Sequence, residues 1–192
     1  MSRHLTHPIT PPARPAERAS TEAVIALGSN LGERADILAD AIRALERLPL
    51  TTNIRVSEPV ETVALTLDGL DESAPAYLNA VALITTRLAP TVLLSLLHRI
   101  EAENGRIRRE RWGSRTLDLD LIAYGDVETD TPTLVLPHPR MHERAFVLAP
   151  LADIAPDLLL HSGQTVAALL RGLPDRDAVQ LRERVDAGSY AS

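Results

Sequence analysis

The sequence of 192 residues contains no cysteine, no lysine and few aromatic residues. Without cysteine it can form neither disulfides nor thiolate metal sites. The sequence therefore does not indicate whether the protein works in an oxidising or a reducing compartment. All 20 basic residues are arginine, which excludes chemistry that depends on a lysine amine. Aromatic residues make up 3% of the chain, so we expect a core built mainly from Leu, Val, Ile and Ala.

Long hydrophobic runs are also absent. Stretches such as AVIAL and TVLLSLL are far shorter than the roughly 20 apolar residues of a membrane-spanning helix, so we expect a cytoplasmic protein. The net charge of −6 disfavours a general binder of nucleic acids or membranes. The balance of 45% hydrophobic and 24% charged residues is typical of a soluble globular protein.

The two ends of the sequence differ from the middle. Residues 1–20 contain four prolines and no helical or strand period, so we expect a disordered N-terminal tail. A transit peptide is the alternative, but the segment has no amphipathic helix. Residues 174–192 are charged and predict a frayed C-terminal tail. We expect residues 21–173 to form a single domain.

The middle of the chain shows strand and helix periods in alternation. Their order, β-α-β-β-α-β, predicts an α+β fold of the ferredoxin-like type, in which an antiparallel sheet carries both helices on one face. A polar loop, residues 67–76, precedes the third strand. Two helices near the C-terminus are additions to this core. The predicted core elements are residues 22–27, 33–49, 51–62, 77–88, 89–105 and 116–124.

Three residues mark the ends of these elements. Gly28 is interpreted as a turn glycine after the first strand. Pro90 fits the first turn of the second helix, where a missing N–H is tolerated. Gly105 is interpreted as the C-cap of that helix.

Two carboxylates stand in the last core strand, TLDLDLIAY. Because residues two apart point the same way, Asp118 and Asp120 share one face, and the leucines between them face the helices. Two close carboxylates repel unless a cation lies between them, and Mg²⁺ binds through one or two carboxylates together with substrate phosphates. The pair therefore indicates a magnesium site, although an exposed Asp pair without function explains the same pattern.

The densest positive charge of the chain directly precedes these acids. Arginine guanidinium groups bind phosphate oxygens in a bidentate manner and stay charged. Acids and arginines together are thus typical of a polyphosphate site. On composition alone, the arginine-rich segment is also compatible with a solvated surface or with a nucleic-acid binding patch. The arginines are Arg106, Arg108, Arg109, Arg111 and Arg115.

The stretch RWGSRTLDLDLIAYGD (111–126) resembles the signature of the 6-hydroxymethyl-7,8-dihydropterin pyrophosphokinase family, R-W-G-x-R-T-[LI]-D-[LI]-D. Three further matches follow the family order: IALGSNLG (25–32), YLNAV (77–81) and LPHPRMHERAFVLAPLADIAP (136–156). The family has a ferredoxin-like fold, in agreement with the strand order above. The resemblance implies transfer of diphosphate from ATP to the pterin hydroxymethyl group, giving AMP and the pterin diphosphate in folate biosynthesis.

The resemblance also implies roles for single residues. Asp118 and Asp120 match ligands of two Mg²⁺ ions, and they count as catalytic together with Arg106 and Arg115. The implied partners are the small molecules ATP and the hydroxymethyl dihydropterin, and we expect no binding to nucleic acid or membranes. Association with neighbouring folate-pathway enzymes is a further possibility. The implied ATP contacts are His98, Glu101, Arg108, Arg109, Arg111, Trp112, His138 and Arg144. The implied pterin contacts are Gly28, Thr62, Tyr77, Asn79 and Phe146.

Some features depart from the family. The arginine loop is one residue shorter, the segment 62–75 is longer, and Pro139 stands where some members have tyrosine.

Two other classes of protein compete with this interpretation. A two-metal nucleotidyltransferase would also place paired aspartates on such a sheet, but the acidity outside the loop disfavours a long polyanion. An RNA-binding module would need aromatic residues on its central strands, where this sequence has NAVALITT and LDLDLIAY.

Overall fold

The computed structural model describes most of the chain between Ala19 and Leu173, together with a short C-terminal strand. Among these residues, no helix is long and apolar enough to cross a membrane. The predicted N-terminal tail lies almost entirely outside the described residues and stays a prediction. The described ranges are 19–66, 69–71, 75–104, 116–141, 144–160, 163–173 and 181–184.

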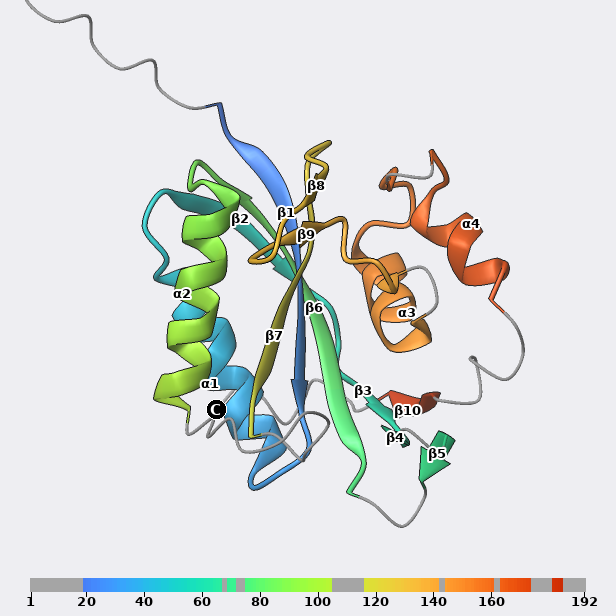
Figure 1. The fold of residues 1–192 in the computed structure, drawn as a ribbon. Helices are drawn as coiled ribbons and strands as arrows, with labels where there is room; N and C mark the ends of the chain where they lie inside the picture. The colour runs from blue at the N-terminus through green and yellow to red at the C-terminus, as the bar shows by residue number, and fades with distance from the viewer. Residues whose placement is uncertain are drawn as a thin grey trace, which may run out of the picture.

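The centre of the molecule is an antiparallel sheet in the order β10-β3-β6-β1-β7, with β2 also paired to β6. β1 is the middle strand of the three long ones and lies between β6 and β7 along its length (Figure 1). β2 and β3 follow one another along the other side of β6. The bounds are β1 Thr21–Ser29, β2 Thr51–Val56, β3 Val60–Thr62, β6 Tyr77–Thr86, β7 Asp118–Tyr124 and β10 Leu181–Arg184.

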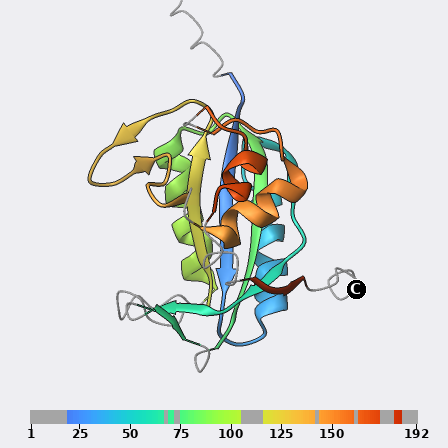
Figure 2. The same ribbon diagram turned by 90° about the vertical axis from the view of Figure 1, so that its right-hand side faces the viewer.

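Helices cover both faces of this sheet. On one face, α1 (Arg34–Glu46) and α2 (Pro90–Glu103) pack against a buried cluster that includes Ile25, Leu27 and Leu119. On the other face, α3 (Ala145–Ile154) and α4 (Val166–Arg171) pack with Val81 and Ile122. Figure 2 shows α3 and α4 in front of the sheet, with α1 and α2 behind it. The antiparallel sheet with two helices on one face confirms the α+β prediction.

The predicted strand 51–62 is two strands in the structure. It breaks between Val56 and Val60, where Pro59 has no N–H to donate to a ladder. Ser57 bridges the break, because its N–H donates to the Val81 carbonyl at 2.9 Å and its hydroxyl accepts from the Val81 N–H at 3.0 Å. β6 therefore keeps partners on both sides of the break.

Two short hairpins stand outside the main sheet. β4 (Ala64–Thr66) pairs with β5 (Gly69–Asp71), and β5 lies inside the segment 67–76 predicted as a polar loop. β8 (Thr129–Asp130) pairs with β9 (Val135–Leu136). Strands this short carry too few residues to show a period in the sequence.

The ends of α2 agree with the sequence in part. Pro90 is the first residue of the helix, as predicted, and Ala89 precedes it in an extended conformation. The C-cap is Asn104, not Gly105, and its side-chain amide donates to the Ile100 carbonyl at 2.9 Å. Gly105 itself lies outside the described residues.

The C-terminal segment differs from the prediction of a frayed tail. Residues 181–184 form β10, which pairs with β3 from Leu181–Thr62 to Arg184–Val60. The sequence LRER lacks an apolar alternation, so its pairing depends on the free edge of β3 and not on a pattern of its own.

Candidate active site at one end of the sheet

Three strands meet at the end of the sheet where β1 ends and β6 and β7 begin (Figure 1). Gly28 of β1 pairs with Asn79 of β6 on one side and with Asp118 of β7 on the other. The predicted pterin amide and a predicted metal ligand therefore lie in one row, separated by a residue without a side chain. With neighbouring strands about 4.8 Å apart, the two backbones are roughly 10 Å apart.

The two carboxylates of β7 occupy one face of the strand, as the sequence predicted. Asp118 and Asp120 are half-buried, and Leu117, Leu119 and Leu121 are buried in the cluster beneath α1 and α2. The side chain of Asp120 is 42% exposed, so a cation can reach it from solvent. The described residues contain no group of three or more His, Asp or Glu that could hold a metal by themselves. Any metal at this pair would therefore need ligands from outside the described side chains, such as substrate oxygens or water.

Beside Asp120 lies a cationic and aromatic group from the segment before α3 and the first turn of that helix. Arg144 Nη1 is 3.6 Å from Asp120 Oδ2, and its guanidinium carbon lies 5.5 Å from the ring centroid of Phe146. His138 is attached to the same strand, because its N–H donates to the Ile122 carbonyl at 2.8 Å. The structure thus gathers His138, Arg144 and Phe146 next to one carboxylate.

The imidazole of His138 is held in its neutral form. Burial lowers its pKa below the ordinary value of 6.5, and the nearby guanidinium groups of Arg144 and Arg140 lower it further. Asp120 acts in the opposite direction. The Nδ1 atom accepts from the Arg140 N–H at 3.3 Å, so Nε2 is the nitrogen that carries the proton in the neutral ring.

On the other side of Gly28, a buried amide is held in one orientation. Asn79 Nδ2 donates to Thr62 Oγ1 at 2.9 Å, and both side chains are buried. A Cβ added at Gly28 would lie 3.0 Å from Asn79 Oδ1 and 3.9 Å from the Tyr77 ring. A side chain at position 28 would therefore have to displace the Asn79 amide, which the hydrogen bond to Thr62 holds in place. The interpretation of Gly28 as a turn residue is wrong, because it lies inside β1.

Glu101 is in a different environment from that expected of a nucleotide contact. It lies on the inner face of α2 with 1% of its surface exposed, and its Oε1 accepts from the Leu119 N–H at 2.9 Å. Leu119 stands between the two aspartates of β7. Glu101 therefore fixes the strand that carries them. His98, by contrast, is exposed on the same helix.

The arginine-rich segment and its tryptophan stay predictions. Residues 105–115 lie outside the described residues. The site residues that this concerns are Arg106, Arg108, Arg109, Arg111, Trp112 and Arg115.

Two residues of the region were not identified from the sequence. Ser29, fully buried, donates from Oγ to the Thr116 carbonyl at 2.6 Å, which ties the end of β1 to the start of β7. Arg34 joins α1 to β3 and to the start of β6. The motif GSN contains Ser29, but no local signal identifies the partners of either residue, which are distant in sequence.

Comparison with known proteins relates this arrangement to one family. Residues 24–156 match the family model of 7,8-dihydro-6-hydroxymethylpterin-pyrophosphokinase (HPPK). A 2-amino-4-hydroxy-6-hydroxymethyldihydropteridine pyrophosphokinase of Pseudomonas aeruginosa is 47% identical over 150 residues, which are 78% of this chain and 90% of the relative. The enzyme of that name from Haemophilus influenzae is 41% identical over 159 residues, covering 83% and 97%.

Solved structures support the fold. The crystal structure of wild-type Plasmodium falciparum HPPK-DHPS has a TM-score of 0.61 at 15% identity and covers 82% of this chain. Its complex with pteroate gives 0.63 at 14% identity. This chain spans less than half of those proteins, 45% and 43% of their length. The family match and the curated relatives extend over most of this chain, and it belongs to the 7,8-dihydro-6-hydroxymethylpterin-pyrophosphokinase family.

Proposed function

We propose that this protein transfers diphosphate from ATP to the hydroxymethyl group of 6-hydroxymethyl-7,8-dihydropterin, giving AMP and the pterin diphosphate in folate biosynthesis. The observation that carries the proposal is the row Asn79–Gly28–Asp118 across three strands of a family member. It offers an amide for a pterin and a carboxylate for a metal-bound polyphosphate in one place. The reaction consumes ATP, and we propose that it takes place in the cytoplasm.

Asp118 and Asp120 are the proposed ligands of two Mg²⁺ ions. They fit this role because they are adjacent on one face, half-buried and still open to solvent. A pair of protein carboxylates suits Mg²⁺, which keeps several waters and binds substrate phosphates. Bound Mg²⁺ would supply charge neutralisation at the phosphates and lower the pKa of the pterin hydroxyl.

The side chains beside Asp120 are proposed to hold the nucleotide. Arg144 presents a guanidinium fork next to the metal ligands, where it can donate hydrogen bonds to phosphate oxygens of ATP. His138 in its neutral form donates one hydrogen bond without adding charge to the site. The arginines between 106 and 115 are proposed to supply further phosphate contacts, and Arg106 and Arg115 to stabilise the transferred group.

The opposite side of Gly28 is the proposed pterin site. Asn79 presents its amide with the Nδ2 end bonded to Thr62, so the amide keeps one orientation. Tyr77 from this side, and Phe146 from beside Arg144 and Asp120, would hold the flat ring between two aromatic faces, so the pterin would extend across Gly28. Gly28, without a side chain, lets the Asn79 amide and the Tyr77 ring lie close over β1. Phosphoryl transfer then depends mainly on positioning the two substrates.

The proposed fold type is ferredoxin-like, with α3 and α4 as C-terminal additions. The order β1-α1-β2 followed later by β6-α2-β7 supports it, since both helices lie on one face of the sheet. Residues 21–173 then form one domain. Association with neighbouring folate-pathway enzymes is also a proposal, supported by likeness to solved structures whose names join HPPK to DHPS.

A product assay tests the proposed function. The full chain is incubated with ATP, Mg²⁺ and the hydroxymethyl dihydropterin, and nucleotides and pterins are separated by chromatography. We expect AMP and pterin diphosphate in equal amounts. A nucleotidyltransferase would instead release inorganic pyrophosphate, and an RNA-binding module would consume no ATP. Either result would reject the proposal.

A further inference from the structure

The first residue of α1 makes its contacts outside its own helix. Arg34 follows Gly32, which has a φ of +70°, and its N–H donates to the Gly32 carbonyl at 2.9 Å. A cation at a helix N-terminus faces the positive end of the helix dipole, which disfavours it there. No feature of the helix itself therefore explains this guanidinium.

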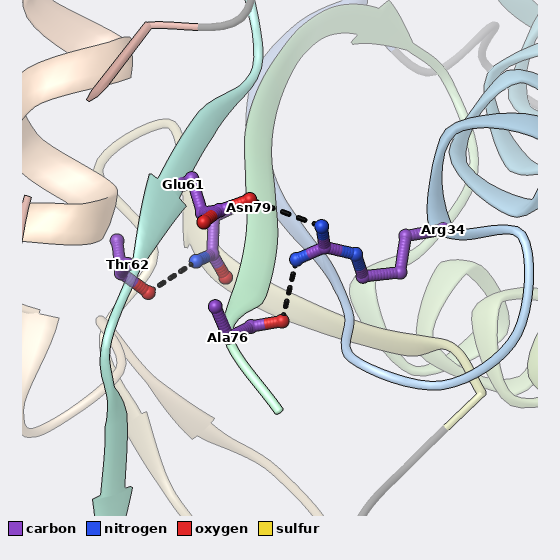
Figure 3. A network of polar contacts seen from close by, with 5 residues as sticks. All are labelled: Arg34, Glu61, Thr62, Ala76 and Asn79. Atoms are coloured by element: carbon purple, nitrogen blue, oxygen red, sulfur yellow. Dashed lines mark hydrogen bonds and ion pairs between the residues drawn. The ribbon is translucent and has the colours of Figure 1, made fainter. Parts of the chain in front are cut away.

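The guanidinium of Arg34 joins two other segments of the chain. Its Nη1 donates to the Ala76 carbonyl at 2.7 Å, and its Nη2 donates to Glu61 Oε2 at 3.0 Å. Ala76 directly precedes β6, and Glu61 is the middle residue of β3. Figure 3 shows the guanidinium lying between these two groups, with the Thr62–Asn79 hydrogen bond close by.

The segments that Arg34 joins carry the proposed pterin contacts. β3 pairs with β6 at three positions only, Val60–Asn79, Glu61–Leu78 and Thr62–Tyr77. A pairing this short has few hydrogen bonds of its own to keep its register. Thr62 holds the Asn79 amide, so any separation of β3 from β6 would release that amide as well.

The contact is better suited to fixing geometry than to stabilising the fold. The side chains of Arg34 and Glu61 are 32% and 27% exposed, and ion pairs open to solvent contribute little to folding. A guanidinium fork, however, holds two acceptors at fixed angles, which a single ammonium cannot do. Arg34 thus fixes the spacing between β3 and the first residues of β6.

We propose that Arg34 is a positioning residue for pterin recognition, which acts through Glu61 and Ala76 to hold Thr62 and Asn79 in register. This inference rests on the proposed pterin site. It assigns Arg34 no contact with either substrate. Loss of the fork should weaken pterin binding while leaving ATP binding unchanged, because His138, Arg144 and Asp120 lie on the other side of Gly28.

The test compares Arg34→Ala, Arg34→Lys and Glu61→Gln with Arg43→Ala. Arg43 is a matched control on α1, since it pairs with Asp40 on the exposed side of the helix. Binding of the pterin is measured by calorimetry in the presence of an ATP analogue and Mg²⁺, and binding of the ATP analogue is measured alone. We expect a pterin Kd raised by about tenfold or more in Arg34→Ala, with ATP affinity within about twofold.

The other variants test whether both contacts of the Arg34 guanidinium are needed. Arg34→Lys should recover little of the affinity, because one ammonium cannot keep both contacts, and Glu61→Gln should fall between Arg34→Ala and the wild type. Arg43→Ala should bind like the wild type. In ¹⁵N-labelled protein, the side-chain amide signals of Asn79 should shift or broaden in Arg34→Ala and stay in place in Arg43→Ala. This signal is read without substrate and does not depend on activity.

Asn79→Ala separates failure of this inference from failure of the proposed function. If Asn79→Ala weakens pterin binding and the Arg34 variants do not, the positioning role is rejected and the pterin site stands. If Asn79→Ala binds the pterin normally, the proposed pterin site and the positioning role of Arg34 are both rejected. Equal losses of pterin and ATP affinity in Arg34→Ala and Arg34→Lys would show general destabilisation and also reject the role.

Discussion

Among single residues, Asp118 and Asp120 have the clearest expected effect on turnover. Changing either to Asn should reduce turnover by about 30- to 1000-fold, because a ligand of the Mg²⁺ that would neutralise the transferring phosphates is lost. The free energy of unfolding should hardly fall, since each change removes half of a like-charge pair, and the contact of Asp120 with Arg144 is partly open to solvent and contributes little. Steady-state kinetics and urea denaturation measure the two effects.

The control for this pair is Asp130→Asn, an exposed carboxylate on β8. It should keep wild-type turnover. Full activity of the wild-type protein in EDTA would contradict the metal assignment.

Glu101 tests whether a buried carboxylate acts on the strand or on the nucleotide. Glu101→Ala leaves the buried Leu119 N–H without its acceptor, so the free energy of unfolding should fall by about 1–3 kcal/mol. Glu101→Gln keeps an acceptor oxygen and should lose less. Glu103→Ala, on the exposed side of α2, is the matched control. A raised KM for ATP with unchanged stability would instead favour direct contact with the nucleotide.

His138 should make folding stability depend on pH. Its pKa is lowered in the folded protein, so the unfolded chain binds the proton more readily. The free energy of unfolding should therefore decrease as the pH falls below about 6.5 toward the lowered pKa. Above pH 6.5 the contribution of His138 to the free energy of unfolding should be constant. In metal-free buffer, urea denaturation of His138→Gln should show a shallower dependence on pH than the wild type. Equal slopes would contradict the assignment, and His98→Gln serves as the control.

At the scale of elements, β10 covers the outer edge of β3, which carries Thr62. A chain truncated after Leu173 should lose about 1–3 kcal/mol of unfolding free energy, because a few ladder hydrogen bonds are removed. Its affinity for the pterin should also fall. A chain truncated after Arg184 keeps β10 and should match the full-length protein. Equal denaturation midpoints for the two truncations would show that β10 contributes nothing.

The elements that could be predicted are those whose apolar residues recur with the period of a helix or a strand. α2 was recognisable from Pro90 and its apolar spacing, and β7 from the alternation of leucines with Asp118 and Asp120. The break before Val60 was not predicted, because it depends on how Ser57 replaces ladder bonds to β6. β10 was not predicted, because its partner lies more than a hundred residues earlier in the chain. Local patterns cannot reveal such pairings.

The same distinction applies to the candidate site. The face of Asp118 and Asp120 follows from the strand period, but Gly28 was placed in a turn because its conflict with Asn79 exists only across strands. Glu101 lies on the same helical stripe as Leu93 and Leu97, but its partner, the Leu119 N–H, is distant in sequence and no local pattern reveals it.

At the scale of the whole molecule, the N-terminal segment should be dispensable. Residues 1–20 have no apolar period to bury, and β1 begins at Thr21. Deleting them should leave the melting temperature and activity almost unchanged. Calorimetry and the product assay measure both properties. A fall of several degrees would show that the segment docks on the domain.

The position of Gly28 between Asn79 and Asp118 has a consequence for motion. Both neighbours belong to strands that pair regularly with β1 from Ile25 to Gly28, so we expect the sites proposed for the pterin and the polyphosphate to move together. Thermal fluctuation within these strands cannot change the distance between the two sites by much. Any displacement that brings the reacting oxygen onto the phosphorus must therefore come from the substrates or from residues outside β6, β1 and β7.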